Sequence, residues 1–155
     1  MPKTFSFTIL LLLCYCTTAK SQEAFVHWQP LVITDSSRIW YDSSVLDTVT
    51  GGKFDIWVLQ MHKPPLSFNE IPGKIYRSKT YYGLNLENGK YEILKVEYFG
   101  INNKKLYSFD YKTKDYPDNM RYAYPIGDNS TLSMLIKKLN KIHGDNKDAN
   151  SGKQN

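Results

Sequence analysis

The sequence predicts an α+β fold, an antiparallel sheet with one C-terminal amphipathic helix packed on it. Residues 25–124 are rich in aromatic and β-branched side chains, are broken by Gly, Pro and Asn, and show no helical periodicity, a pattern typical of strands. Residues 132–142 place aliphatic side chains at spacings of three and four, which indicates a helix. Since no internal repeat is evident, sheet and helix are expected to share one core.

The first residues have the pattern of a secretory signal peptide. Lys3 precedes an almost wholly apolar run, residues 5–16, and a small and polar stretch follows it. The run is shorter than the ~20 apolar residues that a membrane-spanning helix needs, and no second such run follows downstream. Residues 1–21 are therefore predicted to direct export and to be removed, leaving no transmembrane segment.

This leader has two routes of processing. Ala19 and Ser21 are small enough for the pockets of a signal peptidase, so cleavage is expected before Gln22. Lipid attachment at Cys14 or Cys16 is the alternative, but the residue before each cysteine is large, which disfavours it. Both cysteines are expected to be lost with the leader, so the mature domain would contain no disulfide.

The mature chain is expected to hold one domain, residues 22–143, followed by a disordered polar tail, residues 144–155. Its formal charge falls from +5 to +5 − 2 = +3, because Lys3 and Lys20 are the only charged residues in the leader. The remaining lysines are interleaved with Asp and Glu rather than clustered on one stripe. No nucleic-acid partner is therefore expected.

Two segments in the first half of the chain are predicted strands, Arg38 to Tyr41 and Lys53 to Met61. The second has apolar side chains on both of its faces, so it is expected to lie inside the sheet. The segment Lys63 to Gly73 contains three prolines and is predicted to be a loop, because proline cannot donate to a strand ladder.

Two hairpin turns are predicted after that. Asn88-Gly89 favours a two-residue type I′ turn with Glu87 facing Lys90, and a second turn is expected at Asn102-Asn103. The first turn would pair Leu86 with Tyr91, Leu84 with Ile93, and Tyr81 with Val96. The second would pair Tyr98 with Tyr107, Val96 with Phe109, and Leu94 with Tyr111.

Period-two alternation then gathers aromatic side chains on one face of the sheet. The set is Tyr81, Leu94, Val96, Tyr98, Tyr107, Phe109 and Tyr111. A one-residue bulge, for instance at Gly100, would move part of it to the other face. Sheet packing explains each ring alone, whereas a surplus on one face is typical of a contact surface. The candidate protein-contact residues are Tyr81, Tyr98, Tyr107, Phe109 and Tyr111.

The C-terminal helix has clear boundaries in the sequence. The polar run Asp128, Asn129, Ser130 offers an N-cap, and Gly144 is expected to end the helix. Its apolar stripe consists of Leu132, Leu135, Ile136, Leu139 and Ile142.

No residue pattern indicates catalysis. The histidines His27, His62 and His143 are far apart in sequence, and none is spaced as a pair of metal ligands. Motifs for a nucleophile, a phosphate loop or a dinucleotide are absent, and the aspartates among residues 35–55 are typical of turns. The chain is predicted not to be an enzyme and to use no metal or cofactor.

Six short segments stand out by their order and spacing. They are Arg38 to Ser44, Ile56 to Val58, Tyr76 to Lys79, Leu84 to Leu86, Lys90 to Leu94, and Pro125 ahead of Ser130 to Leu132. This arrangement, over residues 28–142, resembles the bacterial surface-adhesin protein E family. The resemblance implies about six antiparallel strands, a C-terminal helix lying on them, and display at the bacterial surface as an adhesin for host or matrix proteins.

The chain departs from that family where a disulfide commonly ties the helix to the sheet. The corresponding positions, Leu86 and a residue near Asn140, are not cysteine, so packing of Leu139 and Ile142 would have to replace the link. The resemblance places the helix on the face of Leu86, whereas the pairing makes the opposite face the more aromatic one. Either the helix covers the aromatic face, or that face is left for a partner.

Three functions follow from these observations. The first is an exported, non-enzymatic surface or secreted binding protein, whose partner is a protein or a second copy of the chain. The alternative is a periplasmic or secreted inhibitor or accessory protein that places the segment His62 to Pro72 in the cleft of an enzyme. A small secreted hydrolase is the third and has the least support.

Overall fold

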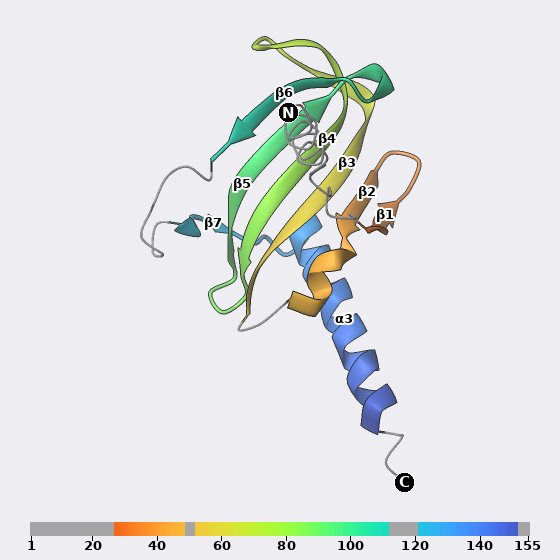
Figure 1. The fold of residues 1–155 in the computed structure, drawn as a ribbon, viewed down its shortest axis with the longest axis vertical. Helices are drawn as coiled ribbons and strands as arrows, with labels where there is room; N and C mark the ends of the chain where they lie inside the picture. Colours follow the sequence, from red (N-terminus) through yellow and green to blue (C-terminus); the bar gives the residue numbers. More distant parts are fainter. Residues whose placement is uncertain (1–26, 49–51, 112–120, 152–155) are drawn as a thin grey trace, which may run out of the picture.

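The computed structural model describes the backbone of residues 27–48, 52–111 and 121–151, and the side chains of 27–45, 52–111 and 121–142. The predicted leader with its cleavage site before Gln22, and residues 152–155 of the predicted tail, lie outside the described residues. The chain forms an antiparallel sheet with a C-terminal helix, so the predicted α+β class is confirmed (Figure 1).

Six strands follow one another in chain order across the sheet, and each is antiparallel to its neighbours. The strands are β1 (Trp28–Ile33), β2 (Arg38–Asp42), β3 (Lys53–Phe68), β4 (Ile71–Asn85), β5 (Lys90–Phe99) and β6 (Lys105–Asp110). A seventh, β7 (Tyr124–Pro125), pairs with β5 beside β6. The helical elements are η2 (Ser43–Thr48), η3 (Ile101–Asn103) and α3 (Thr131–Ser151).

The predicted loop at Lys63–Gly73 is wrong, because β3 and β4 form one long hairpin that continues past the start of β2. Leu66 pairs with Ile75, and Phe68 pairs with Ile71. The register shifts on both sides of Leu66, and Pro64 and Pro65 lie in the first of these shifts. Proline is tolerated there because an irregular stretch does not require every ladder hydrogen bond. The end of the hairpin projects beyond the other strands at the top of Figure 1.

The turn between β4 and β5 has four residues, 86–89, rather than the predicted two. A type I′ turn needs positive φ at both central residues, but of Asn88 and Gly89 only the glycine has it, at 64°. The Asn85 and Asn88 side-chain oxygens instead accept hydrogen bonds from the backbone N–H groups of Glu87 and Lys90, at 3.0 and 3.1 Å. Leu84 consequently pairs with Tyr91, not with Ile93.

The second predicted turn is confirmed. Asn102 and Asn103 both adopt positive φ, at 54° and 63°, as residues of a tight turn should. The expected pairs are present as well, Tyr98 with Tyr107 and Val96 with Phe109. The Tyr111 N–H also donates to the Leu94 carbonyl at 2.8 Å.

A bulge in β5 decides which side chains share a face. Tyr82 pairs with Ile93 but its neighbour Tyr81 pairs with Lys95, so Leu94 is an extra residue on β5. The expected pair of Tyr81 with Val96 is therefore wrong, and Val96 pairs with Thr80. Because directly paired residues point to the same side of a sheet, Val96 and Tyr98 join the face of Leu84, and Tyr81 lies on the other one.

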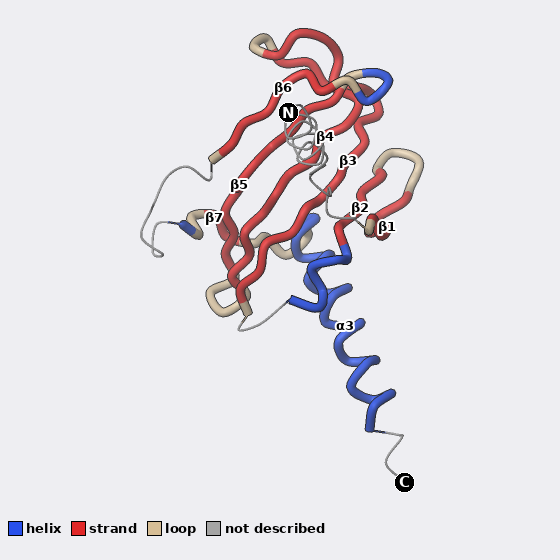
Figure 2. Tube along the Cα trace, in the orientation of Figure 1, coloured by secondary structure: helices blue, strands red, loops and turns tan. Residues whose placement is uncertain are grey.

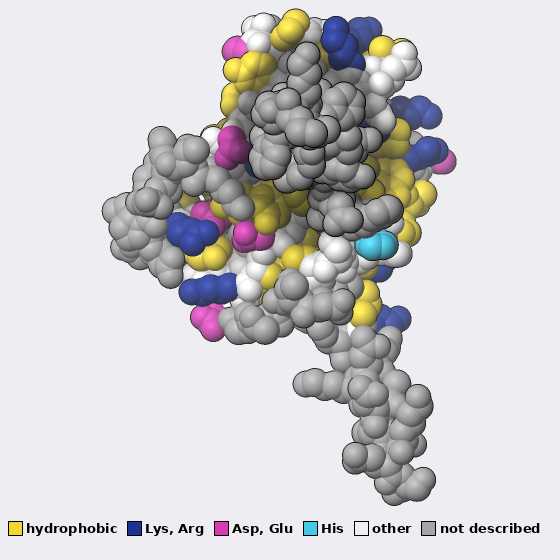
Figure 3. Space-filling model, in the orientation of Figure 1, with side chains coloured by type: hydrophobic (Ala, Val, Ile, Leu, Met, Phe, Trp, Pro, Cys, Tyr) yellow, Lys and Arg dark blue, Asp and Glu magenta, His cyan; other side chains and the backbone are white. Residues whose placement is uncertain are grey.

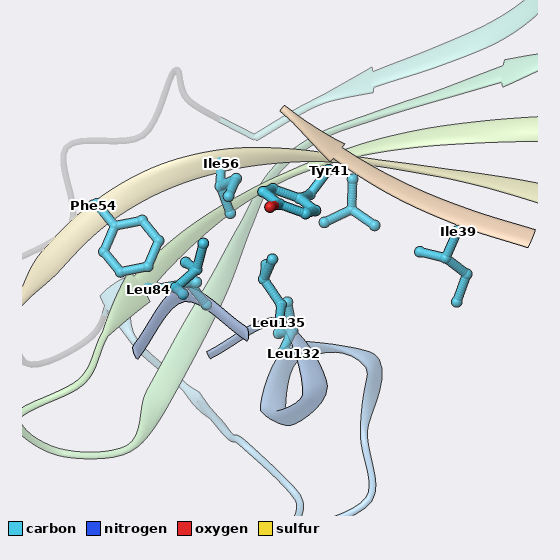
Figure 4. Close-up of a cluster of buried hydrophobic side chains, with 9 residues drawn as sticks. Ile39, Tyr41, Phe54, Ile56, Leu84, Leu132 and Leu135 are labelled. Carbon is cyan, nitrogen blue, oxygen red and sulfur yellow. The ribbon is translucent and has the colours of Figure 1, made fainter. Parts of the chain in front are cut away.

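The main core lies between α3 and the sheet face that carries Leu84, called here the helix face. Figure 4 shows side chains from β2, β3 and β4 pointing toward Leu132 and Leu135 of the helix. The buried cluster is Ile39, Tyr41, Phe54, Ile56, Val58, Leu84, Leu132, Leu135 and Leu139. Leu84 and Leu135 are fully buried, and burial of each leucine of the helix contributes about 2 kcal/mol.

The helix begins where the sequence predicts. The Ser130 hydroxyl accepts a hydrogen bond from the Ser133 N–H at 3.1 Å, which is the N-cap expected from the polar run. At its other end α3 continues past Gly144, so the predicted stop there is wrong. Lys138 donates to the Pro30 carbonyl on β1, and its ammonium lies 5.6 Å from the centre of the Tyr41 ring. These contacts hold α3 on the side of the first strands.

The helix leaves part of its own sheet face uncovered. In Figure 2, α3 and η2 lie at one end of the sheet, and the opposite end consists of strands and the short η3 turn. The ladder runs from Val58 in the core through Thr80 and Val96 to Phe109, so the aromatic side chains of β5 and β6 lie on the helix face. The sequence predicts that the helix either covers the aromatic side chains or lies on the opposite face of the sheet. In the structure, the helix and the aromatic side chains lie side by side on the same face.

Candidate functional site

The uncovered end of the helix face contains a groove of about 500 Å³. We call it the aromatic groove. Its lining residues are Phe68, Glu70, Ile71, Val96, Tyr98, Tyr107, Phe109 and Tyr111. They come from the β3–β4 hairpin end and from β5, β6 and the residue after β6, so two hairpins that are distant in sequence build one site.

The sheet ladder and the bulge place the aromatic rings. Tyr98 and Tyr107 are cross-strand partners, and Phe109 lies one pleat further along the same face of β6. Phe109 is the centre of the set, with ring centroids 4.6 Å from Tyr107, 6.3 Å from Tyr98 and 6.4 Å from Tyr111. These distances are those of favourable aromatic pairs, so the floor of the groove is one connected surface.

The hairpin end forms the other wall. Phe68 packs edge-on against Tyr98 at 5.7 Å, while Ile71 is buried beneath it. The three prolines predict a loop here, so the predicted contact residues do not include Phe68, Glu70 and Ile71. A usable signal was present, since Phe68 and Ile71 are apolar residues on either side of the two-residue turn Asn69-Glu70.

Much of the apolar surface in the groove remains accessible. Phe68 is 44% exposed, Tyr107 43% and Tyr111 52%. An exposed large hydrophobic residue on its own needs no explanation, but three that line one groove form a contiguous patch of the kind found at binding sites.

The polar groups of the groove are few. Burial raises the pKa of the Tyr98 phenol, with a further contribution from Tyr111, so Tyr98 stays protonated at neutral pH and can donate a hydrogen bond. Glu70 supplies one carboxylate at the rim. The site can therefore hold an apolar group, orient it with a phenol and attract a neighbouring positive charge.

Tyr81 does not belong to this site, so the candidate list is corrected by one member. Its ring stacks on Trp57 at 4.8 Å on the opposite face of the sheet, and its hydroxyl donates to Asp55 at 3.3 Å. Burial first, and then the Asp55 charge, raise the pKa of Tyr81 to about 12. The remaining four candidates, Tyr98, Tyr107, Phe109 and Tyr111, are brought together as expected.

The described histidines do not assemble a metal centre. No group of three His, Cys, Asp or Glu side chains close enough to hold a metal occurs within the described ranges. His62 shares a hydrogen bond of 2.9 Å with the buried Ser78 hydroxyl, and burial lowers the pKa of its imidazole. This contact satisfies a buried hydroxyl in mid-strand. His143 lies where side chains are not described.

Comparison of the chain with protein-family models, with curated proteins and with solved structures gives no match. Over the residues that the structure describes, no helix has the length and apolar character required to cross a membrane.

Proposed function

We propose that this chain is an exported, non-enzymatic binding protein of the surface-adhesin protein E type, and that its aromatic groove holds part of a protein ligand. The observation that carries the proposal is the uncovered groove on the helix face, whose rings Phe68, Tyr107 and Tyr111 are between 43% and 52% exposed. Clustered aromatic side chains that reach solvent are enriched at protein interfaces.

The groove also supports an expectation about the ligand. Five rings offer faces and edges to an apolar side chain, and the protonated Tyr98 hydroxyl can donate to a backbone carbonyl beside it. Glu70 at the rim favours a lysine or arginine next to that anchor. The ligand is proposed to be an apolar residue flanked by a basic one, presented on a matrix or host protein.

The test uses intact cells and immobilised matrix proteins. Cells that carry the wild-type chain should bind, and cells lacking it should not. Tyr107→Ala combined with Phe109→Ala should reduce binding at least about tenfold, because aromatic anchors dominate such interfaces. Ile33→Ala is the control, since Ile33 is also an exposed large hydrophobic residue, at 54%, but lies on β1 at the opposite edge of the sheet.

Sedimentation of the purified chain tests the other partner considered, a second copy. If the wild type self-associates, the double variant abolishes assembly, and neither binds matrix proteins, the groove is a dimer interface and the adhesin proposal fails. Equal matrix binding by wild type and double variant would also contradict it.

A second candidate function is inhibition of an enzyme, and one observation favours it. The β3–β4 hairpin end, which includes the segment His62 to Pro72, projects from the sheet and carries the exposed Leu66 (Figure 1). Fractionation separates the two functions: retention in the periplasm would support the inhibitor, and exposure to protease on intact cells would support the adhesin.

A further inference from the structure

We propose that the sheet face opposite α3 binds an acidic polysaccharide along a row of residues that crosses five strands and has a cation on every second one. This surface is distinct from the aromatic groove, and the proposal does not rest on the proposed protein ligand. The row consists of Arg38, Met61, Arg77, Phe99 and Lys105, one residue each from β2, β3, β4, β5 and β6, and we call it the cationic row.

The strand pairing places all five on one face. Arg38 pairs with Met61, Met61 with Arg77, Arg77 with Phe99 and Phe99 with Lys105. Arg77 is an odd-numbered residue of β4, whereas Leu84 and Tyr82 on the same strand point toward the core, so the row faces away from the helix. Figure 3 shows Lys and Arg side chains among hydrophobic ones along the upper and right margins of this face.

The row alternates charge with apolar surface at a regular interval. Cations occur on β2, β4 and β6, and Met61 and Phe99 occupy the strands between them. The β6 cation, Lys105, is also paired with the Glu97 carboxylate at 2.7 Å, so the two arginines supply most of the charge of the row. Neighbouring strands are about 4.8 Å apart, so successive cations are about 10 Å apart. A pyranose unit of an extended glycan is similar in length to one such strand spacing, so two sugars cover the interval between successive cations. The interval therefore matches a chain that carries one carboxylate on every second sugar.

The apolar positions suit sugar rings rather than bases. Arg77 lies over the Phe99 ring at 5.2 Å, and Lys79 and Lys105 lie over it at 5.9 Å, so the ring gathers cations at one point of the row, where a sugar carboxylate can meet them. Single-stranded nucleic acid carries a charge on every nucleotide and takes an aromatic platform for successive bases. The row offers one aromatic ring, and it has a charge only on every second strand. These features favour a polysaccharide over a single-stranded nucleic acid.

The row opens at its β2 end into a cavity of about 270 Å³ that Arg38 and Met61 help to line. Lys63, Ser36 and Tyr76 also line it, which adds a cation, a hydroxyl and an aromatic ring, and Asp35 supplies one carboxylate. This combination can accept the terminal sugar of a chain: hydroxyl groups meet Ser36 and Asp35, and a sugar carboxylate meets Arg38 or Lys63.

Isothermal titration of the full-length mature chain with hyaluronan decasaccharide tests the proposal, because that glycan carries one carboxylate on each disaccharide. Binding is expected at low salt and should weaken as salt rises. Arg38→Gln with Arg77→Gln should reduce affinity at least about fivefold, since two charge contacts are lost. Lys137→Gln with Lys141→Gln removes the same charge from exposed positions on α3 and should leave affinity unchanged.

Three results would overturn the proposal. They are equal binding of a neutral dextran of the same length, tighter binding of oligo-dT with the same number of charges, and equal affinity of the two double variants. Thermal melts of both variants ensure that a loss of binding is not a loss of fold. The Tyr107→Ala, Phe109→Ala variant should still bind hyaluronan, which separates this surface from the aromatic groove.

Discussion

The two ends of the helix face are built from the same strands and differ in what lies on them. At the end covered by α3, Leu84 and Leu135 are fully buried. At the other end, Tyr107 and Tyr111 are about half exposed, although they belong to the same pleated surface. The difference arises because the helix is held beside β1 and β2, by Lys138 and the Pro30 carbonyl among other contacts. One sheet face thus provides both a core and an accessible aromatic surface.

Removing the helix should cause the largest loss of stability, because it eliminates the whole core at the covered end of the helix face. A chain that stops after Asn129 loses the buried Leu132, Leu135 and Leu139, and no cooperative thermal transition is expected in circular dichroism. A chain that stops after Gly144 keeps that stripe and should melt like the chain that continues to Asn155. A cooperative melt of the shorter chain would show that the sheet forms a core without α3.

Leu135→Ala tests the covered end with a single side chain. Because Leu135 is fully buried, its truncation should lower the free energy of unfolding by about 2–5 kcal/mol in urea titrations. Its neighbour Met134 is 38% exposed on the same helix, so Met134→Ala should change stability by no more than about 0.5 kcal/mol. Equal costs for the two variants would contradict the assigned helix face.

The aromatic groove should respond less in stability than in binding. Tyr107→Ala with Phe109→Ala should cost about 1–2 kcal/mol together, because Tyr107 is 43% exposed and Phe109 lies at the partly open floor. Urea titration beside Leu135→Ala gives the comparison directly. A cost as large as that of Leu135→Ala would mean that these rings form a core rather than a binding surface.

The smallest effect concerns Tyr81 on the opposite face and appears only in alkali. Its pKa is raised from 10.0 to about 12 in the folded chain, so the folded state keeps the phenol protonated where the unfolded state ionises it. The stabilisation by Tyr81 is fully present below pH 10 and is lost as pH rises toward 12. Tyr81→Phe should make stability fall less steeply over that window, and an unchanged slope would contradict the shift.

The fold was predictable where side-chain periodicity is strong. The stripe from Leu132 to Leu139, the Ser130 cap and the two-sided β3 strand all followed from local patterns. The β3–β4 hairpin end was not predictable, because its three prolines argue against a ladder of strand hydrogen bonds. The register shifts on both sides of Leu66 accommodate these prolines. Such irregularity depends on tertiary context rather than on local propensity.

The site was predictable only in part, because one bulge controls it. The turn at Asn102-Asn103 correctly gave the pairs of Tyr98 and Phe109, since it depends on residues that tolerate positive φ. The extra residue at Leu94 has no such marker: it is neither glycine nor a turn former, and it is buried. Because of this residue, Tyr81 does not belong to the aromatic groove. The helix and the aromatic groove therefore lie at two ends of one sheet face rather than on opposite faces.

The bulge at Leu94 also means that the location of the binding surface depends on how β5 pairs with β4. If β5 paired without a bulge, Leu94 would lie opposite Tyr81, the part of β5 after it would be shifted by one residue in the ladder, and Tyr98 would exchange sides with Glu97 and Phe99. A regular ladder of the same length would therefore exchange the aromatic groove for a charged surface and leave the order of the strands intact. Loss of one residue at the bulge has the opposite result, because it leaves the observed pairs after the bulge in place, so the groove keeps its face.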